Sequence, residues 1–89
     1  MKYELLYTKK AWSDLQELPI VESRRVVTKL KYFIEQPDPI KHSKPLKGVY
    51  KGLFRFRIGD YRTVFSKDAK GNITILTVIR IQHRKDVYQ

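Results

Sequence analysis

The sequence predicts an α+β fold: a strand and two helices, then three strands, with the helical hairpin packed on one face of a mostly antiparallel sheet. Two observations predict this arrangement. Apolar residues recur every three or four positions up to Ile34, as in helices, and then alternate in the stretch from Phe54 to Phe65. Runs of helices ahead of runs of strands are typical of α+β domains. The 89 residues suit one domain, residues 1–89, built around one core.

The first part of the chain predicts a strand and a helix. The stretch KYELLY, Lys2 to Tyr7, has residues that suit a strand. Thr8 then suits the N-cap of a helix. The apolar positions of this helix are Ala11, Trp12, Leu15 and Leu18. The helix should end at Leu18, because a residue that precedes a proline avoids helical geometry.

Pro19 suits the first turn of a second helix, with Glu22 near the positive end of the helix dipole. The apolar stripe of this helix consists of Val26, Val27, Leu30, Phe33 and Ile34. Residues 36–48, QPDPIKHSKPLKG, are then interrupted by prolines. We expect this segment to be an ordered but irregular loop.

Two turns are predicted between the three C-terminal strands. Gly59-Asp60 is expected to form a two-residue hairpin loop, with Gly59 at the first central position of a type II′ turn. Gly71-Asn72 is expected to form the second turn. The stretch ITILTVIRI that follows is apolar at both odd and even positions, which is typical of a central strand covered on both faces.

The predicted hairpin separates apolar from cationic side chains. Because side chains alternate along a strand, one face should carry Phe54, Phe56, Ile58, Tyr61, Thr63 and Phe65. We expect this face to form the core with Trp12, Leu15, Leu30 and Phe33. The other face, left open, carries Arg55, Arg57 and Arg62. Like charges on opposite strands repel, so this is either the solvated face of an amphipathic hairpin or a surface for an anion, and the choice of arginine favours the anion.

The net charge and composition of the chain limit the kinds of partner and site that it can have. There are 19 Lys+Arg against 9 Asp+Glu, a net charge of +10, and the excess lies in the C-terminal half. A small domain this basic binds a polyanion or an acidic protein, unless its surface is basic in a general way. The absence of cysteine excludes disulfides and thiolate metal sites. Without a long apolar run, a membrane span or signal peptide is not expected, and we expect a cytoplasmic protein.

Two stretches resemble the RelE/ParE superfamily of toxins from bacterial type II toxin–antitoxin systems. They are KPLKGVYKGLFRFRIGDYRTVF, residues 44–65, and HRKDVYQ, residues 83–89. The resemblance implies the same order of elements along nearly the whole chain. For RelE-type members it also implies a ribosome-dependent endoribonuclease, which cleaves mRNA in the ribosomal A site when an RNA 2′-hydroxyl attacks its own phosphate.

The resemblance implies catalytic roles for Arg55, Arg57, Arg62, Arg84 and Tyr88. Guanidinium groups suit the negative charge that develops on the nonbridging phosphate oxygens. Tyr88 is a candidate general base, since adjacent cations favour its phenolate. It can also stack on a base of the mRNA or pack as a C-terminal anchor. The residues expected to contact RNA are Lys44, Lys47, Lys51, His83 and Lys85. For His83, a structural role is the alternative.

We expect no metal and no cofactor, because the chain has few histidines and few acids near the basic patch. The expected partners are the ribosome, mRNA and a cognate antitoxin, which covers the basic surface with an amphipathic, partly acidic segment. Through the antitoxin, the complex can bind operator DNA. Two other interpretations stay open: a ParE-like inhibitor of DNA gyrase, which is not an enzyme, and a catalytically silent module that binds RNA or antitoxin. The HRKDVY ending, together with the arginine strand, favours the nuclease.

Overall fold

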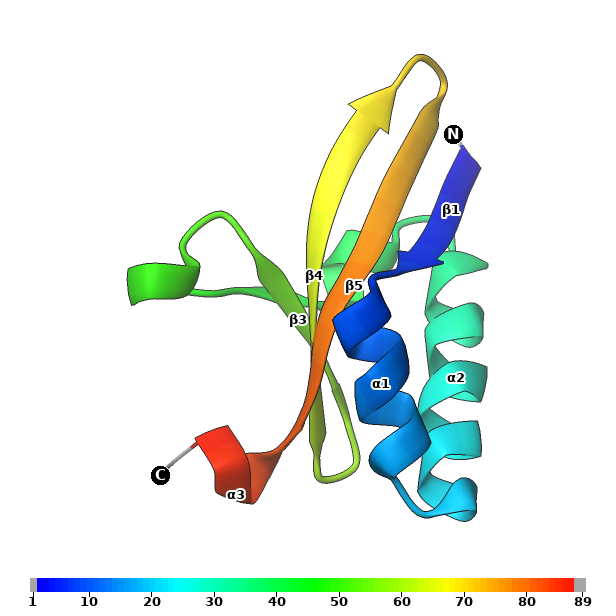
Figure 1. The fold of residues 1–89 in the computed structure, drawn as a ribbon. Coiled ribbons are helices and arrows are strands. Elements are labelled where there is room, and N and C mark those ends of the chain that lie inside the picture. The colour runs from blue at the N-terminus through cyan, green and yellow to red at the C-terminus, as the bar shows by residue number, and fades with distance from the viewer. Residues whose placement is uncertain (1, 88–89) are drawn as a thin grey trace.

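The computed structural model describes residues 2–87, and its elements follow the predicted order (Figure 1). The long elements are β1 (Lys2–Tyr7), α1 (Lys9–Glu17), α2 (Ile20–Ile34), β3 (Phe54–Ile58), β4 (Tyr61–Lys70) and β5 (Ile73–His83). The short ones are the 3-10 helices η1 (Pro39–His42) and η2 (Gly48–Tyr50), the strand β2 (Lys44–Pro45) and the helix α3 (Arg84–Val87). The sequence pattern does not predict β2 or α3.

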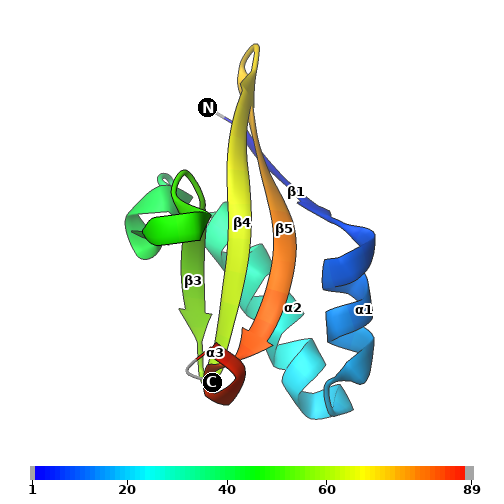
Figure 2. The same ribbon diagram turned by 60° about the vertical axis from the view of Figure 1, so that its left-hand side comes forward.

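The strands form one sheet in the order β1-β5-β4-β3-β2. β1 pairs with β5 in parallel, and the other neighbours pair antiparallel. Helices α1 and α2 lie on one side of the sheet, whereas η2 and α3 project on the other side (Figures 1 and 2). This arrangement confirms the predicted α+β fold, with a helical hairpin on one face of a mostly antiparallel sheet.

The helix ends form where the sequence predicts them. Thr8 caps α1, since its Oγ1 accepts a hydrogen bond from the backbone N–H of Ala11 at 3.1 Å. Helix α1 ends at Glu17, before the Leu-Pro pair. Pro19, expected in the first turn of α2, lies one residue before it as the N-cap, and Glu22 lies in the first turn as expected. Each of these helix ends therefore depends on residues close in sequence.

The β3–β4 hairpin has the predicted register. Ile58 faces Tyr61 directly, so Gly59 and Asp60 form a two-residue loop. The φ angle of Gly59 is +58°, and no other residue type has a positive φ in the part of the chain that the structure describes, which fits a type II′ turn. Because the loop sets the register, it decides which side chains of both strands face the helices.

The hydrophobic core lies between the helical hairpin and the sheet. At its centre Phe56 stacks between Phe33 of α2 and Phe65 of β4, with ring centroids 4.5 Å apart in both pairs. The other members of this buried cluster are Ala11, Leu15, Val26, Leu30, Ile58, Tyr61, Leu76, Val78 and Ile81. The predicted apolar face of the hairpin is therefore confirmed, with Phe54 half-buried at its margin.

The prediction that Trp12 belongs to the core is wrong. Its side chain is 54% exposed and meets Tyr7 edge-on, with ring centroids 6.1 Å apart. The buried residues of α1 are Ala11, Asp14 and Leu15. A residue next to Ala11 in sequence points about 100° away from it around the helix axis. A carboxylate, that of Asp14, occupies the inward position instead.

Strand β5 is central as predicted, between β1 and β4, but only one of its faces is fully covered. Its buried residues are Thr74, Leu76, Val78 and Ile81. Their spacing changes after Val78 because of a β-bulge. Val64 faces Arg80, whereas the next residue of β4, Phe65, faces Val78, which leaves Ile79 as an extra residue in β5.

Candidate functional site

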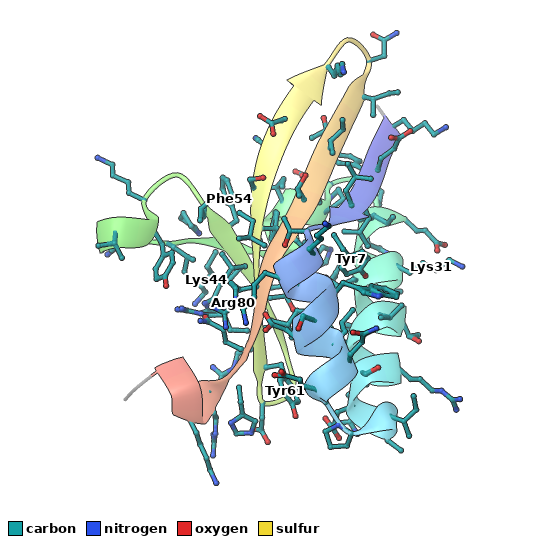
Figure 3. All side chains as sticks on the ribbon, in the orientation of Figure 1. Tyr7, Lys31, Lys44, Phe54, Tyr61 and Arg80 are labelled. Carbon is teal, nitrogen blue, oxygen red and sulfur yellow. The ribbon has the colours of Figure 1, made fainter. Side chains whose placement is uncertain are left out.

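The side of the sheet away from α1 and α2 carries a set of basic residues, the arginine face: Lys44, Arg55, Arg57, Arg62 and Arg80. Strand pairing arranges them in two rows across the sheet, Lys44–Arg55–Val64–Arg80 and Arg57–Arg62–Gln82. The rows are two residues, about 7 Å, apart along the strands. Figure 3 labels Lys44 and Arg80, which form the two ends of the first row on this side of the sheet.

Val64 indicates how the arginine face is packed. It lies on the side of the sheet away from the helical hairpin and yet is only 1% exposed. Its neighbours in the row, Arg55 and Arg80, are half-buried. Arginine stems cover apolar surface while their charged ends reach water. We infer that the stems of Arg55 and Arg80 cover Val64 on this side of the sheet, whereas Lys44 and Arg57 are exposed.

Arg62 is held within the second row. Its Nη2 donates a hydrogen bond to Oε1 of Gln82 at 3.0 Å, and its guanidinium carbon lies 5.7 Å from the centre of the Tyr50 ring. Its Nε is buried and has no hydrogen-bond partner among the side chains that the structure describes. Arg57, directly opposite, is exposed. Among the side chains that the structure describes, those of residues 2–85, neither arginine forms an ion pair with a carboxylate, so no ion pair there relieves their repulsion.

Sequence reasoning missed two residues that meet at the edge of the arginine face, Arg80 and Asp14. Oδ2 of Asp14 accepts hydrogen bonds from Nε of Arg80 and from the backbone N–H of Ile81, both at 2.9 Å. The sequence signal that could have identified these two residues is a charged residue at a position where the pattern expects an apolar one. Asp14 stands three residues after Ala11 in the first helix, and the arginine interrupts the apolar strand ITILTVIRI.

Helix α3 brings Arg84 to the tip of the β3–β4 hairpin. The backbone N–H of Arg84 donates to the backbone oxygen of Asp60 at 2.8 Å, and its Nε lies 3.7 Å from Oδ1 of Asp60. In Figures 1 and 2, α3 lies beside the hairpin end of the sheet, on the side of the arginine face. Lys85 is exposed in the same helix. Tyr88, the remaining predicted catalytic residue, lies outside the described residues.

The other predicted RNA-binding residues lie away from the two rows. Lys47 and Lys51 flank η2, which projects from the sheet, and both are exposed. His83 faces Tyr61, a core residue, and the two rings meet edge-on with centroids 5.2 Å apart. Nδ1 of His83 accepts a hydrogen bond from the backbone N–H of Lys85 at 3.1 Å. The structure therefore separates His83 from the arginine face.

The chemical resource of this surface is fixed positive charge. Guanidinium groups bind phosphate oxygens through paired hydrogen bonds and stay charged at any ordinary pH. Among the side chains that the structure describes, those of residues 2–85, no three of His, Asp or Glu gather into a possible metal site. Over the same described range, no helix is long and apolar enough to cross a membrane.

Known proteins are similar to this chain in both sequence and fold. The family described as the ParE toxin of the type II toxin–antitoxin system parDE matches residues 5–88. Toxin RelG of Mycobacterium tuberculosis is 29% identical over 89 residues, a match that covers 100% of this chain and 99% of that toxin.

Two solved toxin–antitoxin complexes have the same architecture. The RelBE2 complex from Mycobacterium tuberculosis matches with a TM-score of 0.68 and 26% identity, over 94% of this chain and 100% of that one. The archaeal RelE–RelB complex from Pyrococcus horikoshii OT3 matches with a TM-score of 0.68 and 27% identity, over 94% and 97%. Because the family match spans nearly the whole described fold, this chain belongs to the RelE/ParE superfamily and is a toxin of a type II toxin–antitoxin system.

Proposed function

We propose that this toxin is a metal-independent endoribonuclease that cleaves mRNA in the A site of the ribosome. The observation that supports the proposal is the uncompensated pair in the second row. Arg57 and Arg62 face each other across two strands, and no carboxylate among the described residues pairs with either. Such a pair is unfavourable in the free protein and becomes favourable when an anion binds between the two groups.

The proposed reaction needs no group beyond the RNA and the protein. The 2′-oxygen of a nucleotide forms a bond to the adjacent phosphorus, and the bond from phosphorus to the 5′-oxygen of the next nucleotide breaks. The products are a 2′,3′-cyclic phosphate and a free 5′-hydroxyl. One proton leaves the 2′-hydroxyl and one is delivered to the departing 5′-oxygen. Between these events negative charge builds on the nonbridging oxygens, which Arg57 and Arg62 stabilise.

The other basic residues then take different parts. Arg55 and Lys44, in the first row, contact RNA beside the reacting phosphate, and Arg84 contributes charge next to the hairpin tip. Exposed lysines attract RNA and set its position rather than react, and these are Lys47, Lys51 and Lys85. His83 is better suited to holding the start of α3, through its hydrogen bond with the N–H of Lys85.

Primer extension on a translated mRNA tests the proposal. With ribosomes present, the toxin should produce cuts within codons, and without ribosomes those cuts should disappear. Treating the purified toxin with EDTA, and then assaying it with ribosomes in their own magnesium, should leave cleavage unchanged. Loss of cleavage that zinc or manganese restores would contradict metal independence.

Tyr88 stays the candidate for taking the 2′-hydroxyl proton. If it does so, Tyr88→Phe should slow single-turnover cleavage by about 10²–10⁴-fold, the usual size of a general acid–base contribution. If its ring only stacks on a base, Tyr88→Phe should cleave normally and Tyr88→Ala should be impaired. A folded Tyr88→Phe protein that cuts at the wild-type rate would exclude the acid–base role.

A cognate antitoxin is the proposed protein partner. The solved relatives are complexes of a toxin with its antitoxin, and a basic face of this kind fits an amphipathic segment with acidic side chains. The complex would bind operator DNA through the antitoxin. The toxin would act in the cytoplasm, where the ribosomes are.

A second candidate function is inhibition of DNA gyrase, which the match to the ParE toxin family favours. The two candidates differ in a direct measurement. Supercoiling inhibition by the purified toxin, without any cut in translated mRNA, would replace the nuclease with the gyrase inhibitor. Binding of RNA or antitoxin without either activity would indicate a catalytically silent module.

A further inference from the structure

A bulge in β5 turns Arg80 onto the arginine face. Leu76 and Val78 are buried on the helix side, and strict alternation would place residue 80 there as well. The extra residue Ile79 changes the alternation, so that Arg80 faces Val64. Bulges often re-aim a side chain beside an active site. An arginine in the core would need its charge compensated there, which makes the bulge a condition for an arginine at this position.

Residues at and near the start of α1 form hydrogen bonds with the backbone groups of β5 around the bulge. Beyond its last pair, at Val78, β1 no longer covers this edge. Thr8 donates from its backbone N–H to the oxygen of Val78 at 3.0 Å, and from Oγ1 to the oxygen of Ile79 at 3.2 Å. Asp14 then accepts from the N–H of Ile81 at 2.9 Å. These bonds need no arginine, so the contact between Asp14 and the guanidinium calls for a separate explanation.

Asp14 holds Arg80 by one side of its guanidinium. Nε of Arg80 lies 2.9 Å from Oδ2 of Asp14, and the two side chains are 37% and 7% exposed. A guanidinium has several N–H donors, and this bond uses the one at Nε, which leaves the two terminal NH₂ groups for an anion. Oδ1 of Asp14 lies 3.6 Å from Nζ of Lys10. Two cations against one carboxylate keep the local charge positive.

We propose that Asp14 is a positioning residue, which holds Arg80 so that it binds a phosphate of the RNA next to the one that is cleaved. This inference rests on the proposed nuclease function. Arg80 shares its row with Lys44 and Arg55, about 7 Å along the strands from the row of the reacting phosphate. The two rows therefore suit successive phosphates of one strand. A side chain that is already held loses less freedom when RNA binds.

The test of Arg80 is the salt dependence of binding to a single-stranded RNA oligonucleotide. Arg80→Ala should weaken binding and make the slope of log affinity against log salt shallower by about 0.7, the contribution of one phosphate contact on single strands. Lys31→Ala is the matched control for charge, since Lys31 is exposed on α2, which packs on the other side of the sheet. The control should leave the slope nearly unchanged.

The Asp14→Asn variant distinguishes two roles of Asp14, charge compensation and the positioning of Arg80, because the two roles predict opposite results. Asp14→Asn keeps an oxygen for the N–H of Ile81 but raises the net charge by one. If Asp14 only offset positive charge, this variant would bind RNA more tightly and cleave normally. If it positions Arg80, single-turnover cleavage should fall by about 10- to 100-fold, the range for one hydrogen bond to a charged group. Glu17→Gln makes the same change of charge at an exposed position of α1 and should cleave normally.

A double variant shows whether Asp14 acts through Arg80. Once Arg80 is alanine, Asp14→Asn should have little further effect on cleavage, because contacting residues that act together are not additive. Thermal melting checks that each variant is folded, and Asp14→Glu, which keeps the carboxylate, should restore most of the cleavage that Asp14→Asn loses. Additive losses, or an Arg80→Ala variant that cuts and binds as the wild type does, would overturn this inference alone. A wild-type protein that neither cuts nor binds RNA would overturn the proposed function with it.

Discussion

The two sides of the sheet differ in whether their side chains find all their partners within the folded chain. On the helix side, Phe56 is 0% exposed, and both rings that cover it, Phe33 and Phe65, come from the chain itself. On the arginine face, Arg57 and Arg62 face each other with no carboxylate paired to either among the described residues. The helix side is complete when the chain folds. We propose that an anion from outside completes the arginine face, and we therefore assign stability to the helix side and function to the arginine face.

Alternate residues of the same strands serve these two sides. In β3, Phe56 is buried between Arg55 and Arg57, which point the other way. A substitution on one side should therefore leave the side chains of the other side in place. The two sides meet at Asp14, which is buried in the apolar stripe of α1 and bonds Arg80 of the arginine face. Apart from this contact, we expect substitutions on the helix side to change stability and substitutions on the arginine face to change cleavage.

The largest effect should come from the helix side. Phe56→Ala removes the central ring of the stack and should lower the free energy of unfolding by about 3–5 kcal/mol, as for other buried phenylalanines. This is a large part of the roughly 5–15 kcal/mol typical of a folded domain. Urea denaturation measures the loss.

Phe54→Ala is the matched control for Phe56→Ala. Phe54 lies at the margin of the core, half-buried, with its ring centroid 5.7 Å from that of Phe65. Its loss should cost clearly less, because the site can collapse or fill with water. Equal losses in the two variants would mean that the core is not centred on Phe56.

Much of the fold could be predicted because local residues specify it. Thr8 caps α1, Pro19 separates the helices and Gly59 sets the register of the hairpin, each through bonds or angles within a few residues. The position of Trp12 could not be predicted in this way. Asp14 turns inward instead, where it bonds Arg80, a partner 66 residues away that the local pattern does not reveal.

The candidate site could be predicted only in part. Arg55, Arg57 and Arg62 follow from the alternation of the hairpin, and the structure brings them together on one face. Arg80 could not be found by alternation, because the bulge at Ile79 reverses it and no turn residue marks a bulge in that strand. Local patterns therefore identify the rows that regular strands build, and they miss what an irregularity adds.

A smaller effect, of a different kind, should come from the arginine face. Arg62→Ala should slow single-turnover cleavage by about 10²–10³-fold, the cost of removing one donor that stabilises transition-state charge. Its free energy of unfolding should change much less than that of Phe56→Ala, because Arg62 is only half-buried and does not belong to the core cluster. Cleavage and urea denaturation of the same preparation measure the two effects.

Arg62→Lys sharpens this prediction. Lysine keeps the charge but lacks the planar fork that binds two phosphate oxygens at once, so cleavage should stay well below the wild-type rate. Full activity in Arg62→Lys would reduce the role of Arg62 to general attraction of RNA. A loss of stability as large as that of Phe56→Ala would contradict the separation of the two sides.

The smallest effect should come from Tyr7, which tests how dry the helix side is. Its hydroxyl is buried without a hydrogen-bond partner among the described side chains, and burial raises the pKa of Tyr7 above its ordinary value of 10.0. Tyr7→Phe removes this hydroxyl and keeps the ring beside Trp12. At neutral pH the free energy of unfolding should rise slightly, by less than about 1 kcal/mol, because an unpaired buried hydroxyl is unfavourable.

The pH dependence of this variant has a definite sign. Because the pKa of Tyr7 is higher in the folded chain than in the unfolded one, the unfolded chain loses this proton first as the pH rises through about 10. Unfolding then releases a proton, so the free energy of unfolding of the wild type falls as the pH rises. Tyr7→Phe has no phenol at this position and therefore lacks this pH-dependent loss. The stability difference between the two proteins, from urea denaturation at about pH 8 and about pH 10.5, should therefore widen with pH. A constant difference would mean that water reaches the Tyr7 hydroxyl in the folded protein, and the helix side would then be wetter at this edge than its stacked rings indicate.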